Sequence, residues 1–222
     1  MRLSPDRPLG KVLRFFVEGL LWASLKGGLR GVYLRGELPK EAVVLTMNHH
    51  SFYDGHLVWL LGRLARRRIS LLVAEENLRA FPVLSLAGAL PAGRVREALR
   101  RLRRGEWVAL FPEGSMGYPG ALGPLRPGAG WLARKAGVRV LPVAARVAFR
   151  GFAHPEAFLW VGPPLAPEED LASYLGTLLA ELDGLLAQTH PRAAPEGFRE
   201  VVRGRRSLEE RVRPWVEALK RL

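Results

Sequence analysis

Short apolar runs alternate with helical patterns along most of this 222-residue chain, and this alternation limits the fold more than any other feature. The run AVVLTMN (42–48) is nearly continuous in apolar residues, as a strand buried on both faces of a parallel sheet would be. We therefore predict an α/β fold with a mixed, largely parallel central sheet flanked by helices. The other predicted strands are 31–38, 69–75, 106–114, 138–147 and 157–162, and the predicted helices are 55–67, 95–105, 128–137, 167–188 and 207–222.

The predicted organisation has three parts: an N-terminal amphipathic helix region (1–30), an α/β domain (31–190), and a C-terminal linker and helix (191–222). The apolar run at 12–25 would reach roughly 21 Å as a helix, too short for a ~30 Å hydrocarbon core. Two interpretations stay open: a helix lying in the membrane interface, and a helix packed on its own domain. The interfacial interpretation puts Phe15, Phe16, Leu20, Leu21 and Trp22 in the acyl boundary and Arg2, Arg7, Lys11, Arg14, Lys26 and Arg30 near headgroups.

The charge balance indicates an anionic partner. Thirty-four Lys and Arg residues stand against 21 Asp and Glu residues, a net charge of +13, so an anionic membrane surface or a phosphate-bearing substrate is expected. Nucleic acid is not expected, because the arginines are scattered rather than grouped with stacking aromatics. The chain has no cysteine, which excludes disulfides, thiolate metal sites and cysteine nucleophiles.

Three histidines and an aspartate fall within the nine residues NHHSFYDGH (48–56), at the end of a predicted strand. The segment FPEGS (111–115) ends another strand, and ligands of α/β sheets bind at the carboxyl ends of strands, so the two clusters are expected to meet. His49 with Asp54 suits an acid–base pair, in which the carboxylate holds the imidazole in one tautomer while it takes a proton from a hydroxyl. In the alternative interpretation, these are only capping side chains and a satisfied histidine.

A metal site is the other alternative for this cluster. His49, His50, Asp54, His56 and Glu113 are all ligand types, but two adjacent histidines on an extended chain would diverge. We therefore predict no metal.

Four segments together resemble the glycerolipid acyltransferase family, which includes the 1-acylglycerol-3-phosphate acyltransferases. NHHSFYD (48–54) is similar to the N-H-x-S-x-x-D block, GALPAGR (88–94) to the second block, FPEGS (111–115) to F-P-E-G-[ST], and VLPVA (140–144) to the fourth block. They occur in the family's order, within roughly residues 30–165. In the phosphatidate-forming members the third block usually continues Thr-Arg, whereas here Met116 follows Ser115.

The resemblance implies an acyltransferase without a cofactor. Its acyl donor would be acyl-CoA or acyl-ACP, and its acceptor a lysolipid hydroxyl, with 1-acylglycerol-3-phosphate first and a non-phosphate glycolipid, pigment glycoside or amino-acid lipid as the alternative. His49 would be the general base and Asp54 its orienting partner. The implied binding residues are Arg94, Glu113, Gly114, Ser115 and Arg126, and the implied supporting residues are Asn48, Ser51, Gly88 and Pro112.

Two further expectations accompany the resemblance. The chain would be peripheral or monotopic on the cytoplasmic side of the cell membrane. The segment FPVLSLAGALPA (81–92), which is poor in charge, would line an apolar groove for the acyl chain or belong to the buried core.

Overall fold

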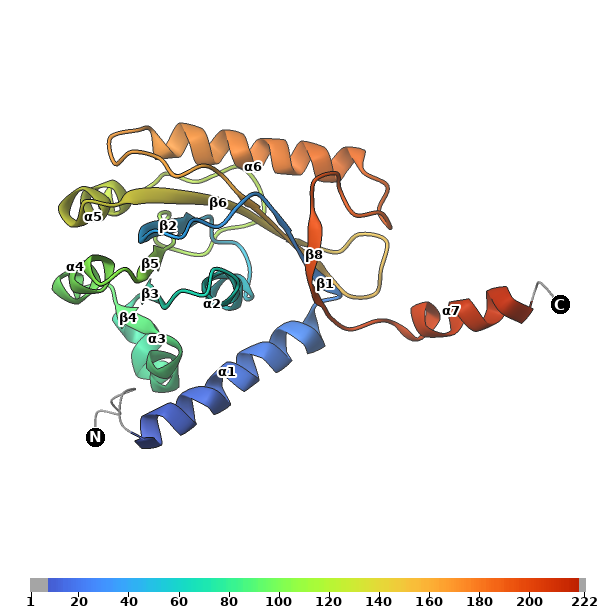
Figure 1. Cartoon of the computed structure of the whole chain (residues 1–222). Helices are drawn as coiled ribbons and strands as arrows, with labels where there is room; N and C mark the ends of the chain where they lie inside the picture. Colours follow the sequence, from blue (N-terminus) through green and yellow to red (C-terminus); the bar gives the residue numbers. More distant parts are fainter. Residues whose placement is uncertain (1–7, 220–222) are drawn as a thin grey trace.

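The computed structural model describes residues 8–219, which form a single sheet with helices on both of its faces (Figure 1). Within that range the eight strands lie in the order β4-β3-β5-β2-β6-β7-β1-β8. The strands are β1 (Gly31–Arg35), β2 (Val43–Met47), β3 (Ile69–Val73), β4 (Ala89–Pro91), β5 (Trp107–Leu110), β6 (Arg139–Ala148), β7 (Glu156–Val161) and β8 (Arg199–Arg203). The helices are α1 (Pro8–Gly28), α2 (Asp54–Leu64), α3 (Glu75–Ala80), the 3-10 helix η1 (Pro82–Ala87), α4 (Val95–Arg103), α5 (Gly128–Ala136), α6 (Leu171–Gln188) and α7 (Leu208–Leu219).

The sheet is largely parallel. Strands β4, β3, β5, β2 and β6 pair in parallel, so their carboxyl ends lie along one edge of the sheet. Strand β7 is antiparallel to β6, β1 is parallel to β7, and β8 is antiparallel to β1. The predicted fold class is therefore confirmed.

The two faces of the sheet are covered by different helices. Leu45 and Met47 of β2 pack with α1 and α2 on one face, whereas Val44 packs with α4 and α5 on the other. Helix α6 covers the second face farther along, over Ala144 and Phe158 (Figure 1). All five residues of β2 are buried, because both of its faces are covered, which explains its continuous apolar run.

The predicted helix over 167–188 starts too early. Helix α6 begins at Leu171, and the side chain of Asp170 accepts hydrogen bonds from the backbone N–H groups of Ala172 and Ser173. Leu165 bridges Val140 of β6, and residues 167–169 form a turn in which Glu169 N–H donates to the carbonyl of Ala166, so the helix cannot start earlier. Asp170 therefore caps the helix from outside, and no acidic residue lies in its first turn.

Several elements were not predicted. Strand β8 lies where a linker was expected. It is an edge strand that buries only Val202, so its sequence REVVR is mostly charged and lacks the apolar pattern of a strand. Helix α3, η1 and the three-residue strand β4 also escaped prediction. In strand β3 only Ser70 is fully buried, because Ile69, Leu71 and Val73 line an apolar cavity.

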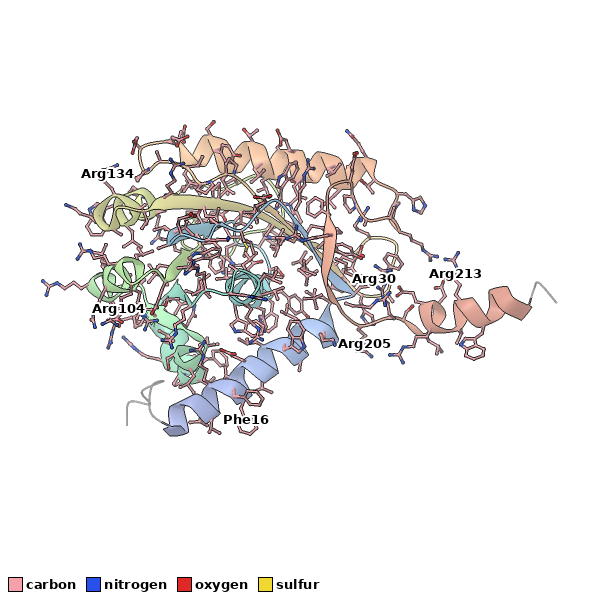
Figure 2. All side chains as sticks on the ribbon, viewed as in Figure 1. Phe16, Arg30, Arg104, Arg134, Arg205 and Arg213 are labelled. Carbon is pink, nitrogen blue, oxygen red and sulfur yellow. The ribbon has the colours of Figure 1, made fainter. Side chains whose placement is uncertain are left out.

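Helix α1 is apolar on two sides. Val17 and Leu25 are buried against the domain, whereas Phe15, Phe16 and Leu20 are exposed; Figure 2 shows Phe16 pointing away from the body. The helix is thus packed on its own domain while also presenting an apolar surface.

One basic residue of this region was assigned wrongly. Arg30 does not reach outward to headgroups, because it pairs with the buried carboxylate of Glu156 at 2.6 Å and with Glu210 at 2.8 Å. Arg2 and Arg7 lie outside the described residues, as does the side chain of Lys11.

Candidate active site

The loop that follows β2 brings His49 and Asp54 into direct contact. His49 Nδ1 lies 2.7 Å from Asp54 Oδ2, and the aspartate side chain is fully buried at the start of α2. The same oxygen accepts hydrogen bonds from the backbone N–H groups of His50 and Ser51, at 2.7 and 2.8 Å. The expectation that Asp54 caps α2 is therefore wrong: its carboxylate turns back to the loop, where three donors converge on it.

The imidazole of His49 is held on two sides. Its Nδ1 faces Asp54, and its ring stacks on Phe111 with a centroid separation of 4.0 Å and an angle of 11° between the planes. A neutral imidazole that donates from Nδ1 leaves the lone pair on Nε2. Nε2 makes no hydrogen bond among the described residues, and the side chain is 20% exposed, so this nitrogen can receive a proton from a ligand.

Glu113 joins the two polar clusters. One carboxylate oxygen accepts the backbone N–H of His49 at 2.7 Å, and the other accepts the N–H of Gly123 at 3.1 Å. Gly117 N–H in turn donates to the carbonyl of His49 at 2.8 Å. The expectation that the histidines and FPEGS meet at one sheet edge is confirmed. The resemblance implies that Glu113 binds substrate, but both of its oxygens accept hydrogen bonds from loop backbone, so the geometry favours a role in holding the loops.

Gly114 and Arg126 form the outer wall of this loop. Gly114 has φ +78°, and a Cβ added there would lie 2.5 Å from Nε of Arg126, so the arginine side chain crosses directly over the glycine. The backbone N–H of Arg126 donates to the carbonyl of buried Pro112 at 2.8 Å. Ser115, the next residue, is exposed. The guanidinium of Arg126 therefore lies directly against the FPEGS loop.

Asn48 and Ser51 support the loop from within. The amide of Asn48 is buried and makes two hydrogen bonds with the backbone of Ala145 in β6, accepting at 2.8 Å and donating at 3.1 Å. Ser51 Oγ accepts the N–H of Tyr53 at 3.2 Å, which shapes the turn into α2. The loop carrying His49 is thus pinned to the neighbouring strand.

The match to known proteins follows this geometry. The family model described as Acyltransferase matches residues 31–146, just over half of the chain, including the loops of His49 and Glu113. The chain belongs to the acyltransferase family. The match ends within β6, so α6, β8 and α7 lie outside it.

Two similar proteins from plants are named as 1-acyl-sn-glycerol-3-phosphate acyltransferases. The chain is 28% identical over 159 residues to the chloroplastic 1-acyl-sn-glycerol-3-phosphate acyltransferase BAT2 of Brassica napus, covering 62% of this chain and 43% of that protein. It is 27% identical over 142 residues to the chloroplastic LPAT1 of Arabidopsis thaliana, covering 55% and 38%. The chain thus spans less than half the length of these two relatives.

A solved structure has the same fold. The 1-acyl-sn-glycerophosphate (LPA) acyltransferase PlsC from Thermotoga maritima superposes with a TM-score of 0.58 and is 24% identical, covering 82% of this chain and 81% of that one.

Arg94 and Gly88 lie near strand β4, at the far end of the strand order from β8. Gly88 has φ +102°, and a Cβ there would lie 2.5 Å from the carbonyl oxygen of Ile69, so only glycine fits this turn into β4. Arg94 is exposed after β4, three strands from β2, which is about 14 Å at ~4.8 Å per strand. The structure places it on the edge that carries His49 but not in contact with it.

An apolar cavity of about 390 Å³ opens beside the segment that carries His49 and Asp54. Part of its lining comes from the expected segment 81–92. The rest was not predicted, because α1, α2 and β3 meet only in the folded chain. The full lining is Leu21, Phe52, Gly55, His56, Val58, Trp59, Ile69, Leu71, Val73, Phe81, Leu84, Ala87 and Ala89.

The other two histidines of the cluster do not join His49. His50 Nε2 accepts the N–H of Val147 at 3.1 Å, and burial lowers the pKa of the His50 imidazole below its ordinary 6.5. Burial likewise lowers the pKa of His56, which lines the cavity. No three His, Asp or Glu residues in the described part of the chain are grouped to hold a metal ion.

Arg146 was missed by the sequence analysis. It is buried, binds both carboxylate oxygens of Asp183 at 2.6 and 2.7 Å, and donates to the carbonyl of Gly120. It therefore ties the loop after FPEGS to α6. A charged residue inside the apolar strand VRVLPVAARV was the available signal.

Proposed function

We propose that this chain transfers a fatty acyl group from an acyl thioester, either acyl-CoA or acyl-ACP, to a lysolipid hydroxyl, with 1-acylglycerol-3-phosphate as the acceptor. The observation that carries the proposal is the contact of His49 Nδ1 with buried Asp54, which leaves Nε2 open at the carboxyl edge of the sheet. The relatives named as 1-acyl-sn-glycerol-3-phosphate acyltransferases support this acceptor.

In the proposed reaction, His49 Nε2 removes the proton of the acceptor hydroxyl as its oxygen attacks the thioester carbonyl. The tetrahedral adduct then collapses, the carbon–sulfur bond breaks, and the departing sulfur takes the proton from the imidazolium. Asp54 stabilises the imidazolium that exists between these steps. A positioned base of this kind contributes about 10²- to 10⁴-fold in rate, and no acyl-enzyme forms.

The apolar cavity supports the acyl side of the proposal. Phe52, Gly55 and His56 belong both to its lining and to the segment that carries His49 and Asp54. An acyl chain in the cavity would therefore have its thioester end near Nε2. Each buried methylene would contribute about 0.8 kcal/mol to binding.

The phosphate of the acceptor has two candidate partners. Arg126 lies against the FPEGS loop, and Arg94 lies on the same sheet edge with its side chain exposed. A guanidinium fork suits a phosphate because it can donate two parallel hydrogen bonds. Met116 occupies the position where an arginine follows in phosphatidate-forming relatives. This difference supports a second candidate function, in which the same acyl transfer goes to an acceptor with a neutral head group.

Membrane attachment through α1 is part of the proposal. Phe15, Phe16 and Leu20 form an exposed apolar stripe on a helix that also packs against the domain. In the described part of the chain, no helix is long and apolar enough to cross a bilayer. We propose that α1 lies in the interface on the cytoplasmic side of the membrane, and expect F15S/F16S to weaken binding to anionic vesicles.

The reaction is tested with purified protein and labelled acyl-CoA or acyl-ACP. His49→Ala should reduce turnover by about 10²- to 10⁴-fold, while His190→Ala, an exposed histidine on the loop after α6, should leave it unchanged. Equal rates for His49→Ala and wild type would reject the mechanism.

The acceptor is tested separately. Lysophosphatidate is compared with neutral glycolipid acceptors in wild type, Arg126→Gln and Arg94→Gln. Under the proposal, KM for lysophosphatidate rises in one or both variants while neutral acceptors are unaffected. Higher wild-type activity on a neutral acceptor would select the second candidate.

A further inference from the structure

Helix α7 carries an unpaired apolar stripe. It follows β8 and projects beyond the sheet (Figure 1). Leu208, Val212, Trp215 and Val216 are all exposed, with Leu208 and Trp215 each 75% exposed. Their spacing of four, seven and eight residues from Leu208 places them on one side of the helix. The stripe is an apolar surface on a helix whose other residues include Glu209, Glu210, Arg211 and Arg213.

The opposite side of α7 is tied to the body of the protein. At about 100° per residue, Glu210 lies about 180° from the middle of the stripe. Its carboxylate pairs with Arg30 at 2.8 Å and Arg206 at 3.2 Å. Ser207 completes a capping box, since Glu210 N–H donates to Ser207 Oγ at 3.2 Å and Ser207 N–H donates to Glu210 Oε2 at 3.1 Å. These contacts turn the apolar stripe away from the domain.

The segment around the start of α7 is strongly basic. Residues 203–213 contain five arginines and two glutamates. Arg203, Arg205 and Arg211 are exposed and make none of the ion pairs found among residues 8–219, and Figure 2 shows Arg205 on the turn that leads into the helix. An apolar stripe with a tryptophan, beside unneutralised arginines, is complementary to the acyl boundary and phosphates of an anionic bilayer.

Helix α7 starts at the edge of the sheet that carries the active site. Glu156, the first residue of β7, pairs in register with Ala148 at the carboxyl end of β6, and β6 runs parallel to β2. Arg30 binds Glu156 and Glu210 together, so it connects this edge to α7. Helix α7 therefore begins at the same sheet edge that carries the loop of His49.

We propose that α7 is a membrane-binding helix, whose apolar stripe enters the interface of an anionic bilayer while the neighbouring arginines bind lipid phosphates. A second copy of the chain is a poorer occupant, because α7 has 12 residues and a coiled coil needs three or four heptads. The proposal concerns binding only, and it stands whether or not the reaction proposed above is correct.

The absence of cysteine in the sequence allows a site-specific test. Val212→Cys is labelled with an environment-sensitive fluorophore in the full chain, and Glu181→Cys, on the exposed side of α6, is the matched control. With phosphatidylglycerol-containing vesicles, the label at 212 should shift to the blue and brighten, and the label at 181 should not. Phosphatidylcholine vesicles should give a weaker response. A label at 212 that stays in water would overturn the proposal.

Vesicle flotation gives the second measurement. L208S/W215S should lose at least about tenfold in affinity for the anionic vesicles, whereas Trp131→Ser, on α5, should bind like wild type. Turnover of L208S/W215S on a detergent-dispersed acceptor should be unchanged, which separates lost binding from lost catalysis. Wild-type affinity for the vesicles in L208S/W215S would refute the proposal. It would also be refuted if light scattering showed that wild type is a dimer and L208S/W215S a monomer, with vesicle binding unchanged.

Discussion

Replacing Asp54 by asparagine tests the electrostatic part of the mechanism with little change in shape. Asp54 is fully buried, and its Oδ2 accepts hydrogen bonds from His49 Nδ1 and from the N–H groups of His50 and Ser51. In Asp54→Asn the amide oxygen can still accept these bonds, but the negative charge beside the imidazolium is gone. At about 4 Å between charge centres and an effective dielectric constant near 20, that charge contributes about 4 kcal/mol.

A loss of about 4 kcal/mol in the transition state corresponds to about a thousandfold in kcat. The assay is steady-state acyl transfer with labelled thioester, together with the free energy of unfolding from denaturant titration. Asp54→Ala provides the contrast: it leaves two backbone donors unpaired, so it should also lower the free energy of unfolding by about 1–3 kcal/mol for each donor. If the kcat of Asp54→Asn is within threefold of wild type, the electrostatic role is refuted. That result would mean that the oxygen of residue 54 only orients the imidazole ring, which an uncharged amide oxygen can also do.

The remaining predictions concern stability, pH and chain length. Because burial lowers the pKa values of His50 and His56, the unfolded chain binds more protons below pH 6.5, so the free energy of unfolding should fall as pH decreases from about 6.5 towards the folded-state values. Denaturant titrations between pH 7.5 and 5 measure this, and a smaller slope is expected for His50→Gln. Gly88→Ala should cost about 1–3 kcal/mol of stability by thermal or denaturant unfolding, because of its positive φ and the carbonyl of Ile69. Gly55→Leu should fill part of the cavity and reduce kcat/KM for long acyl chains more than for short ones, and an unchanged chain-length profile would mean that the acyl chain binds elsewhere.

Most of the sheet could be predicted because its strands are encoded locally. The continuous apolar residues of β2 reflect burial on both faces, and the pair His49 and Asp54 lies only five residues apart, within one strand–loop–helix turn. Such short-range features need no knowledge of the rest of the fold. The edge strand β8 could not be predicted from such local features, because it buries one side chain and its sequence is mostly charged.

The sequence by itself determined the α/β class, the pairing of His49 with Asp54 and the resemblance to the acyltransferases, since each rests on periodicity or on residues close along the chain. Only the tertiary structure decided that Glu113 holds the His49 backbone, that Arg30 pairs inward with Glu156 and Glu210, and that the apolar stripe of α7 faces outward. It also assembled the cavity from α1, α2, β3 and η1. Contacts between distant segments depend on how whole elements pack, and no local pattern specifies which buried carboxylate a given arginine will meet.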